Sequence, residues 1–351
     1  MDISKNFFEA IDLVLNLPQN TCPYIKNTKQ IVSTKDIVYN MNYPFTCQMD
    51  TYFVPKKEGK YPVMLYIHGG GFVAGGKQYR IAMSQWMAEN GIFVVCVDYG
   101  LAPEYIYPDP IKHLVSAVNW IADHAKEYNL DLDKLFVAGD SAGGYYSSML
   151  CAVANNKTLQ TVFDVSPKID LKAAVLICGL YDIKKTFETK AAFNMDGKVF
   201  KSFTGIDVKD YATYELKDYI SPIDFIDSSF PPTFMVYAKR DLFCEGQAEC
   251  LINKLNEVGV YHEEIHSNSL LSNHCYNLNW LSLDADRANK ALLNFVTRFV
   301  TGEKFVSHHR KQNLNSKSKI SAPHDDNEPL TNDNLATLSE NTDNTTATTS
   351  K

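Results

Sequence analysis

The order of apolar runs along the chain limits its fold more than any other feature. Short runs rich in β-branched and aromatic residues alternate with longer segments whose apolar residues have helical spacing. The runs typical of strands cover 61–67, 92–99, 134–139, 172–179, 232–238 and 261–267. Helices are expected near 79–90, 110–128, 142–155 and 246–258. Because such alternation is typical of βαβ units, the sequence predicts an α/β fold with a mostly parallel central sheet and helices on both faces.

Segments outside this alternation suggest the domain organisation. Residues 31–40 and 45–55 have no long helix between them and are predicted to pair as antiparallel edge strands. Residues 183–226 mix polar and aromatic side chains, and we expect them to contribute, with residues 1–30, to a partly helical cap over the strand ends. One longer ordinary crossover is the alternative for this segment.

Composition sets the expected limits of the folded part. The chain has 351 residues, and 45% of them are hydrophobic, which is enough for one large core. We therefore predict a single catalytic domain over residues 1–306. Residues 307–351 contain no aromatic side chain and are dominated by Asn, Ser, Thr, Lys and Asp, so they are predicted to be a disordered polar tail.

A serine between two glycines follows one of the predicted strands. In "VAGDSAGG" Ser141 stands two residues after Gly139 and two residues before Gly143, and a helical pattern begins directly behind it. A G-x-S-x-G turn of this kind between a strand and a helix exposes the serine as a nucleophile above the sheet. A serine in an ordinary small-residue loop is the alternative.

A second glycine-rich segment, "YIHGGGFVAGG", follows the strand predicted at 61–67. Glycines allow backbone N–H groups to turn toward a developing negative charge, which is how an oxyanion hole is built. Gly70 and Gly71, with the N–H of Ala142, are the expected donors. A flexible loop or a phosphate cradle is the alternative, although the segment lacks the Lys-Ser/Thr ending of a P-loop.

Three motifs together carry a resemblance to a known family: "HGGGFVAGG" at 68–76, "DYGLAPEYIYP" at 98–108 and "GDSAGG" at 139–144. In this order they resemble the hormone-sensitive-lipase-like branch of the α/β-hydrolase fold esterases, over roughly residues 45–300. The resemblance implies an α/β-hydrolase fold and a serine hydrolase acting on small, short-acyl carboxylic esters. Gly100 stands where the family usually has arginine or serine, and "RDLFCEG" replaces the usual Asp-Pro-Leu around the acid.

A serine nucleophile needs a histidine base and a carboxylate that orients the base, and in this fold both follow the serine in the order Ser, acid, His. Asp241 follows the strand predicted at 232–238, and His274 lies on a later loop, so these two are the predicted acid and base. Asp182 and Glu245 are the alternative acids.

The remaining histidines are assigned other roles. His68 is expected to order the glycine loop, and structural or solvated roles are expected for His113, His124, His262, His266, His308 and His309. Asp140 and Glu104 are expected to brace the serine turn and a neighbouring loop. Aromatic residues beside the motifs are candidates for substrate binding, with core packing as the alternative: Phe72, Tyr145, Tyr181 and Tyr276.

Charge and cysteine content exclude several other classes of protein. The formal net charge is −7, and no basic cluster interleaved with aromatic residues occurs, which argues against nucleic-acid binding. No apolar run of about 20 residues is present, so no membrane span is expected. The eight cysteines lack zinc-ligand spacing and are expected to be reduced thiols. Neither a metal nor an organic cofactor is predicted.

The N-terminal residues have the pattern of an amphipathic helix without a basic region ahead of an apolar stretch, so no signal peptide is expected and the predicted location is cytoplasmic. The expected partner is a small-molecule ester substrate, and a homo-oligomer is left open. Three functions remain: a serine carboxylesterase, an amidase, formamidase or peptidase with the same triad, and a non-catalytic binding protein that keeps the hydrolase pocket.

Overall fold

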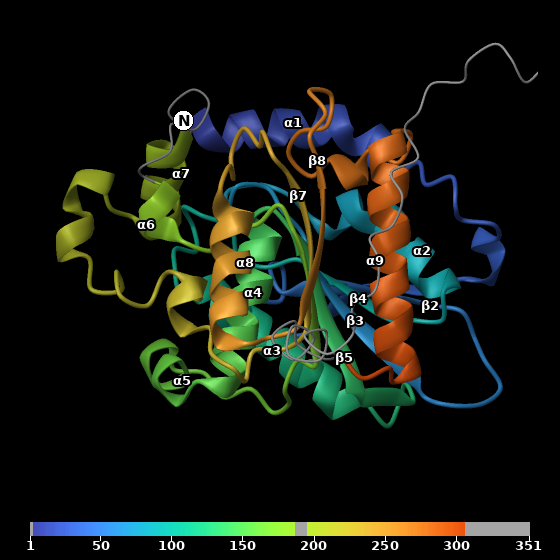
Figure 1. Cartoon of the computed structure of the whole chain (residues 1–351). Coiled ribbons are helices and arrows are strands. Elements are labelled where there is room, and N and C mark those ends of the chain that lie inside the picture. The colour runs from blue at the N-terminus through green and yellow to red at the C-terminus, as the bar shows by residue number, and fades with distance from the viewer. Residues whose placement is uncertain (1–2, 187–194, 306–351) are drawn as a thin grey trace, which may run out of the picture. The chain divides into compact units, whose positions relative to one another are not determined.

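The computed structural model is organised around one eight-stranded sheet with the strand order β1-β2-β4-β3-β5-β6-β7-β8 (Figure 1). The strands are β1 (Val32–Val38), β2 (Gln48–Phe53), β3 (Tyr61–Ile67), β4 (Phe93–Val97), β5 (Leu130–Asp140), β6 (Ala173–Ile177), β7 (Thr233–Ala238) and β8 (His262–Ser267). Strand β2 is antiparallel to β1 and β4, and every other neighbouring pair is parallel. The predicted mostly parallel sheet and the antiparallel pairing of the two N-terminal strands are confirmed.

Helices cover both faces of this sheet (Figure 1). One face packs against α2 (Ile81–Glu89) and α9 (Leu283–Thr301). The other packs against α3 (Asp109–His124), α4 (Ala142–Asn155), α5 (Lys157–Phe163) and α8 (Gln247–Val258). Every residue of β3, β4, β6 and β7 is buried, as expected for parallel strands covered on both faces. The α/β class predicted from the alternating pattern is therefore confirmed.

Strand β5 is longer than the sequence pattern predicts, because it begins at Leu130 instead of Lys134. Its first residues pair with Tyr61 and Pro62 at the start of β3, and the register shifts before Val63. The four added residues alternate leucine with aspartate and are mostly partly exposed, so they do not continue the apolar run of the buried end. The predicted run marked only the buried end of β5, which leads into the serine turn.

Three helices lie toward the carboxyl ends of the parallel strands: α1 (Ile3–Gln19), α6 (Ile183–Thr186) and α7 (Met195–Thr204). Figure 1 shows α1 and α7 near one another at the top, and residues of the two helices contact each other. The 3-10 helices η4 (Val208–Thr213) and η5 (Pro222–Phe225) follow α7. The segments predicted to form a cap therefore adopt largely helical structure, and their role as a cap stays a prediction.

The structure describes residues 3–186 and 195–305. By their internal contacts the described residues belong to one unit. The predicted polar tail, 307–351, lies outside the described residues, and so does the part of the predicted cap segment at 187–194. No helix within the described ranges is both long and apolar enough to cross a membrane.

Candidate active site

Ser141 occupies the turn that joins the end of β5 to the start of α4. Its backbone has φ 54° and ψ −119°, which is strained for a residue with a side chain. The helix begins immediately behind it and approaches β3 so closely that a Cβ on Gly143 would lie 2.0 Å from the carbonyl oxygen of Ile67. Glycine is needed at position 143 because any side chain there would push the helix away from the sheet.

The side chains of Ser141, His274 and Asp241 lie in one hydrogen-bonded row. His274 Nε2 is 2.8 Å from Ser141 Oγ, and Nδ1 is 2.8 Å from each carboxylate oxygen of Asp241. With the imidazole proton on Nδ1, this nitrogen donates to Asp241 and Nε2 accepts from the serine hydroxyl. The structure brings together the three side chains that the sequence nominated from distant segments.

The carboxylate of Asp241 is held in its ionised form. It is 4% exposed, and Oδ1 accepts hydrogen bonds from the N–H groups of Phe243 and Cys244 at 2.9 Å each. Burial alone would raise the pKa of Asp241, but the charge and hydrogen bond of His274 and the two N–H donors lower it below its ordinary value. In the same way, burial favours neutral His274, but Asp241 raises the pKa of this histidine well above 6.5.

Asn273 ties the acid loop to the base loop, a role that the sequence pattern did not reveal. Its Oδ1 accepts hydrogen bonds from the N–H of Leu242 at 3.1 Å and from the N–H of His274 at 2.7 Å. Its Nδ2 donates to the carbonyl oxygen of Arg240 at 2.9 Å. The side chain thereby fixes the backbone on both sides of the contact between Asp241 and His274.

The glycine loop after β3 runs beside Ser141. Gly70 has φ +135°, and its carbonyl oxygen accepts from the N–H groups of Val73 and Ala74 at 3.2 and 3.0 Å. In the described part of the chain, the N–H groups of Gly70 and Gly71 donate no hydrogen bond, and Ala142 begins α4, where an N–H has no intrahelical partner. Within the described residues the three N–H groups predicted as oxyanion donors therefore have no internal acceptor, and their role as an oxyanion hole stays a prediction.

A buried ion pair holds the serine turn from below. Asp140, which is 1% exposed, accepts from Arg80 Nε at 2.8 Å and from Nη2 at 2.6 Å. The Tyr66 hydroxyl and the Gly69 N–H also donate to this carboxylate, at 3.0 and 3.2 Å. Burial would raise the pKa of Asp140, but Arg80 and Tyr66 lower it overall. These contacts fit the bracing role expected for Asp140, whereas Glu104 is exposed.

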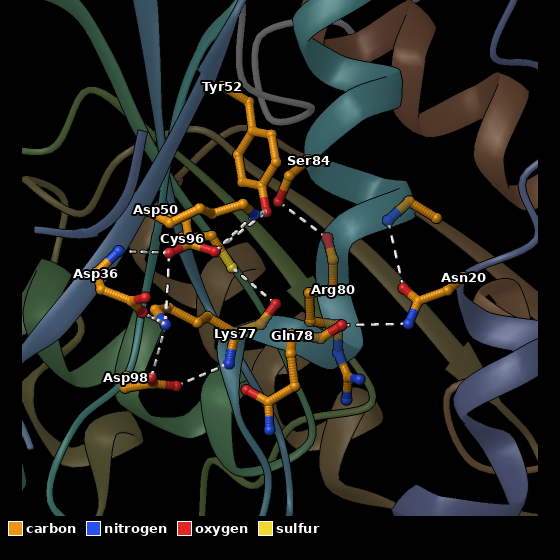
Figure 2. A network of polar contacts seen from close by, with 12 residues as sticks. Asn20, Asp36, Asp50, Tyr52, Lys77, Gln78, Arg80, Ser84, Cys96 and Asp98 are labelled. Atoms are coloured by element: carbon orange, nitrogen blue, oxygen red, sulfur yellow. Dashed lines mark hydrogen bonds and ion pairs between the residues drawn. The ribbon is translucent and has the colours of Figure 1, made fainter. Parts of the chain in front are cut away.

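Lys77 forms a second anchor near the glycine loop (Figure 2). Its Nζ lies 2.6 Å from Asp36, 3.4 Å from Asp50 and 3.4 Å from Asp98, and its backbone N–H donates to Asp98 at 2.7 Å. The three carboxylates lie on or beside β1, β2 and β4, so one ammonium group holds together strands from different parts of the sequence. The pattern gave no signal for this residue, because a single lysine in a loop is usually solvated.

The alternative acids and the other histidines are not part of the hydrogen-bonded row of Ser141, His274 and Asp241. Asp182 Oδ1 accepts from the Lys185 N–H, and Glu245 is exposed. His68 is buried, stacks on Tyr99 and has its Nδ1 2.7 Å from the Gly69 carbonyl oxygen, consistent with the loop-ordering role predicted for it. Burial lowers its pKa below 6.5. The others are placed on α3 or β8 (His113, His124, His262, His266) or outside the described residues (His308, His309).

Two pockets meet at Ser141. The apolar pocket has a cavity volume of about 60 Å³ and includes Phe72, Leu180, Phe200, Phe203 and Phe243 in its wall. The polar pocket has about 290 Å³ and includes Asp12, Gln19, Arg80, Asn273, His274 and Tyr276. Phe8, from α1, and Phe243 line both pockets, as does Ser141 itself.

The four aromatic residues predicted to bind substrate occupy different environments. Phe72 lines the apolar pocket and Tyr276 the polar pocket. Tyr145 is fully buried and donates to the Ile220 carbonyl oxygen at 2.7 Å, and the hydroxyl of buried Tyr181 accepts from the Gly179 N–H at 3.2 Å. Neither tyrosine is part of either pocket wall, so the structure places both in the packed interior, behind the surface that a substrate would touch.

Two groups of side chains around His274 have the atoms to bind a metal ion. They are Cys178 with His274 and Cys275, and Asp241 with Cys244 and His274, with ligand atoms within 4.8 Å of one another in each group. Both groups depend on His274, whose two nitrogens already contact Ser141 and Asp241. A metal bound there would compete with the hydrogen-bonded row, so the arrangement favours acid-base use of this histidine.

Residues 49–255, more than half of the sequence, match the BD-FAE family. The chain belongs to the BD-FAE family. Sequence relatives include the probable carboxylic ester hydrolase LipM of Mycobacterium tuberculosis, 28% identical over 57% of this chain and 46% of LipM. Carboxylesterase NlhH of the same organism is 29% identical over 60% of this chain and 65% of NlhH. The chain therefore spans about half to two thirds of the length of these relatives.

Solved structures share the fold of this BD-FAE member. Esterase B from Lactobacillus Rhamnosis superposes with a TM-score of 0.73 and 17% identity, covering 90% of this chain and 97% of the esterase. The carboxylesterase EstE1, cloned from a metagenomic library, gives a TM-score of 0.65 and 22% identity over 86% of this chain and 98% of its own. The predicted α/β-hydrolase fold and the resemblance to the hormone-sensitive-lipase-like esterases are confirmed.

Proposed function

We propose that this protein is a serine carboxylesterase that hydrolyses small carboxylic esters with Ser141, His274 and Asp241 as its triad. The observation that carries the proposal is the unbroken hydrogen-bonded row from the Ser141 hydroxyl through His274 to Asp241, with 2.8 Å at each contact. Relatives named as carboxylesterases support ester bonds over amide bonds. An intact row beside an open pocket also argues against a purely binding role.

The reaction proceeds through an acyl-enzyme. Ser141 Oγ attacks the ester carbonyl carbon while His274 Nε2 takes its proton, and the negative oxygen is stabilised by the N–H groups of Gly70, Gly71 and Ala142. The intermediate collapses as His274 returns the proton to the alcohol oxygen, which leaves. Water then attacks the acyl-enzyme, with the same histidine as base, and the carboxylic acid is released. Asp241 stays ionised and stabilises the imidazolium.

The apolar pocket is the proposed acyl site. It contains Ser141 and both Gly71 and Ala142, and its other walls are mainly aromatic and aliphatic. A water molecule needs roughly 10–15 Å³ on a comparable measure. A cavity of about 60 Å³ therefore has room for a short acyl chain only. Phe72 and Phe203, which both line this pocket, stack at a centroid distance of 4.2 Å.

Other parts of the proposal rest on the sequence alone. They are a catalytic domain over residues 1–306, a cytoplasmic location, and catalysis without metal or cofactor. The chain spans about half to two thirds of the length of its curated relatives, so these three statements concern residues 1–351 only.

A substrate panel with a matched variant tests the proposal. The wild-type protein and Ser141→Ala are assayed with p-nitrophenyl acetate, butyrate and octanoate and with the corresponding anilides. We expect hydrolysis of acetate and butyrate above octanoate, little cleavage of anilides, and loss of activity in Ser141→Ala. Retained activity in this variant would exclude Ser141 as the nucleophile, and faster cleavage of anilides than of esters would favour an amidase. Ser147→Ala is the control, because it removes another buried serine hydroxyl, farther along α4, and is expected to keep the esterase activity.

A further inference from the structure

The position of His274 indicates which of the two pockets at Ser141 receives the alcohol portion of an ester. His274 belongs to the wall of the polar pocket and not to that of the apolar pocket. In the proposed reaction the alcohol oxygen receives its proton from His274 Nε2, so the alcohol must lie on the imidazole side of Ser141. The polar pocket is therefore the alcohol site.

One side chain in this pocket lacks a partner. Asp12, on α1, is 6% exposed and lines the polar pocket, and its Oδ2 atom is buried without a hydrogen-bond partner in the described part of the chain. An unpaired buried carboxylate is costly, and most buried charges are paired. A buried carboxylate that lines a ligand pocket and has one oxygen without a hydrogen-bond partner among the described residues is suited to accept a hydrogen bond from the ligand.

The nearby cation, Arg80, already donates its hydrogen bonds to other residues. Its Nε and Nη2 donate to Asp140, and its Nη1 donates to Gln19 Oε1 at 2.7 Å and to the Tyr79 carbonyl oxygen at 3.0 Å. The charge of Arg80 is thus balanced mainly by Asp140, so Arg80 offsets the negative charge of Asp12 only in part. A neutral hydroxyl would satisfy the hydrogen bond alone, whereas a protonated amine would satisfy both the hydrogen bond and the charge.

We propose that Asp12 determines alcohol specificity by binding a protonated amine on the alcohol portion of the ester. The inference rests on the proposed esterase function and adds the chemical class of its leaving group: amino alcohols. Asp12 makes no contact with the reacting atoms and acts by binding the amine while Ser141 and His274 perform the reaction.

An isosteric pair of substrates tests this assignment. In 2-(dimethylamino)ethyl acetate a protonated nitrogen occupies the position of the branched carbon in 3-methylbutyl acetate, so the two esters differ in charge and in one N–H donor. At about pH 7, we expect kcat/KM for the amine to exceed that for the hydrocarbon by about tenfold or more, the size of a buried charge-assisted hydrogen bond. The hydroxyl analogue, 3-hydroxy-3-methylbutyl acetate, is expected to fall between them.

Asp12→Asn removes the charge and keeps the shape. We expect the ratio of the two kcat/KM values to fall to about one in this variant. Glu9→Gln is the matched control, because it removes the same charge from the exposed side of the same helix and leaves the ratio unchanged. A ratio near one in the wild-type protein, or an unchanged ratio in Asp12→Asn, would overturn the inference. Hydrolysis of either acetate would still leave the esterase proposal standing, whereas hydrolysis of neither would count against that proposal.

Two further readouts separate this role from a structural one. Burial raises the pKa of Asp12 to about 6, opposed by Arg80 and assisted by Asp140 and Glu9, so the ratio is expected to rise from about pH 5 to about pH 7 in the wild type only. The other titratable groups facing the pocket are His274, Cys275 and Tyr276. A protonated His274 disfavours the cationic ester relative to the neutral one, and because this effect is also present in Asp12→Asn, the difference between the two pH profiles gives the part due to Asp12. Methyl esters carrying the amine on the acyl side are expected to gain nothing from Asp12, and a gain there would overturn the pocket assignment.

Discussion

Asp140 and Asp12 are both buried, both line the polar pocket and both interact electrostatically with Arg80, yet they differ in their hydrogen-bond partners and in the direction of their pKa shifts. Asp140, at the end of β5, has four hydrogen-bond donors and a pKa below its ordinary value. Asp12, on α1, has an unpaired oxygen and a pKa raised to about 6 by burial. Burial alone therefore does not set the protonation state of a carboxylate, because its hydrogen-bond partners decide the direction of the pKa shift.

The same contrast holds for the two walls as a whole. The sheet wall, which carries Asp140, Asp241 and His274, is held by internal ion pairs and by Asn273. The helix wall, which carries Phe8 and Asp12, packs by aromatic contact with Phe243 at a centroid distance of 5.8 Å. We infer that the sheet wall performs the chemistry and needs rigid geometry, whereas the helix wall selects the substrate.

The largest expected loss of activity follows a substitution on the sheet wall, at the acid Asp241. Asp241→Asn keeps the shape but removes the charge that orients and supports His274, and we expect kcat to fall by about 10⁴-fold. Because Asp241 raises the pKa of His274, activity of the wild type is lost as pH falls through that raised pKa, and the variant's acidic limb is expected at lower pH. The measurement is kcat/KM against pH.

Asp182→Asn is the control for this prediction, since Asp182 also follows a strand but contacts the Lys185 N–H instead of a histidine. Its kcat is expected to stay within about twofold of the wild type. An equal loss in both variants would remove the distinction between the acid and its sequence rival.

The next effect concerns stability. Arg80→Met leaves Asp140 buried without its cation, and we expect the free energy of unfolding to fall by about 3–5 kcal/mol at neutral pH. Part of this loss should return on acidification, because a protonated Asp140 no longer needs a cation. Urea unfolding measures both quantities. Arg287→Met, at a residue whose side chain is 73% exposed, is expected to change the unfolding free energy by no more than about 0.5 kcal/mol.

Asn273→Ala tests whether positioning alone matters on the sheet wall. The variant loses the link between the Asp241 and His274 loops, and kcat is expected to fall by about tenfold to a hundredfold with little change in KM. Asn273→Asp, which keeps the acceptor oxygen for both N–H groups, is expected to recover part of kcat. A loss confined to thermal stability, with unchanged kcat, would make Asn273 a structural residue only.

The smallest effect is expected on the helix wall. Since the pKa of Asp12 is raised to about 6 from 3.8, the folded protein binds a proton more tightly than the unfolded chain, and stability contributed by this group falls as pH rises between these values. Asp12→Asn lacks this loss, so at about pH 7 its unfolding free energy should exceed that of the wild type by about 1 kcal/mol. Destabilisation instead would show that Asp12 has an internal partner, and the contrast with Asp140 would be lost.

Local patterns predicted the parts of the molecule that depend on neighbours in sequence. The strand and helix alternation, the turn at Ser141 and the glycine loop all follow from short stretches whose spacing has a physical meaning. Asp241 and His274 were also within reach, because strand ends in a parallel sheet meet at one edge.

Contacts between segments that are distant in sequence could not be predicted from local patterns. Arg80 pairs with a residue 60 positions away, and Lys77 joins three strands, which no local spacing encodes. Asp12 left one signal, because it follows Phe8 by four residues and so shares the apolar face of the helix. Tyr145 and Tyr181 show the converse limit: nearness to a motif in sequence does not decide whether a side chain faces the pocket or the core.

Covalent labelling shows directly whether Ser141 is the nucleophile of a working triad. The protein is treated with a fluorophosphonate and the adduct is located by peptide mass spectrometry, with Asp241→Asn and Ser141→Ala treated in parallel. We expect one adduct on Ser141 in the wild type, much slower labelling in Asp241→Asn, and none at this position in Ser141→Ala. Labelling at another residue, or none in the folded wild-type protein, would contradict it.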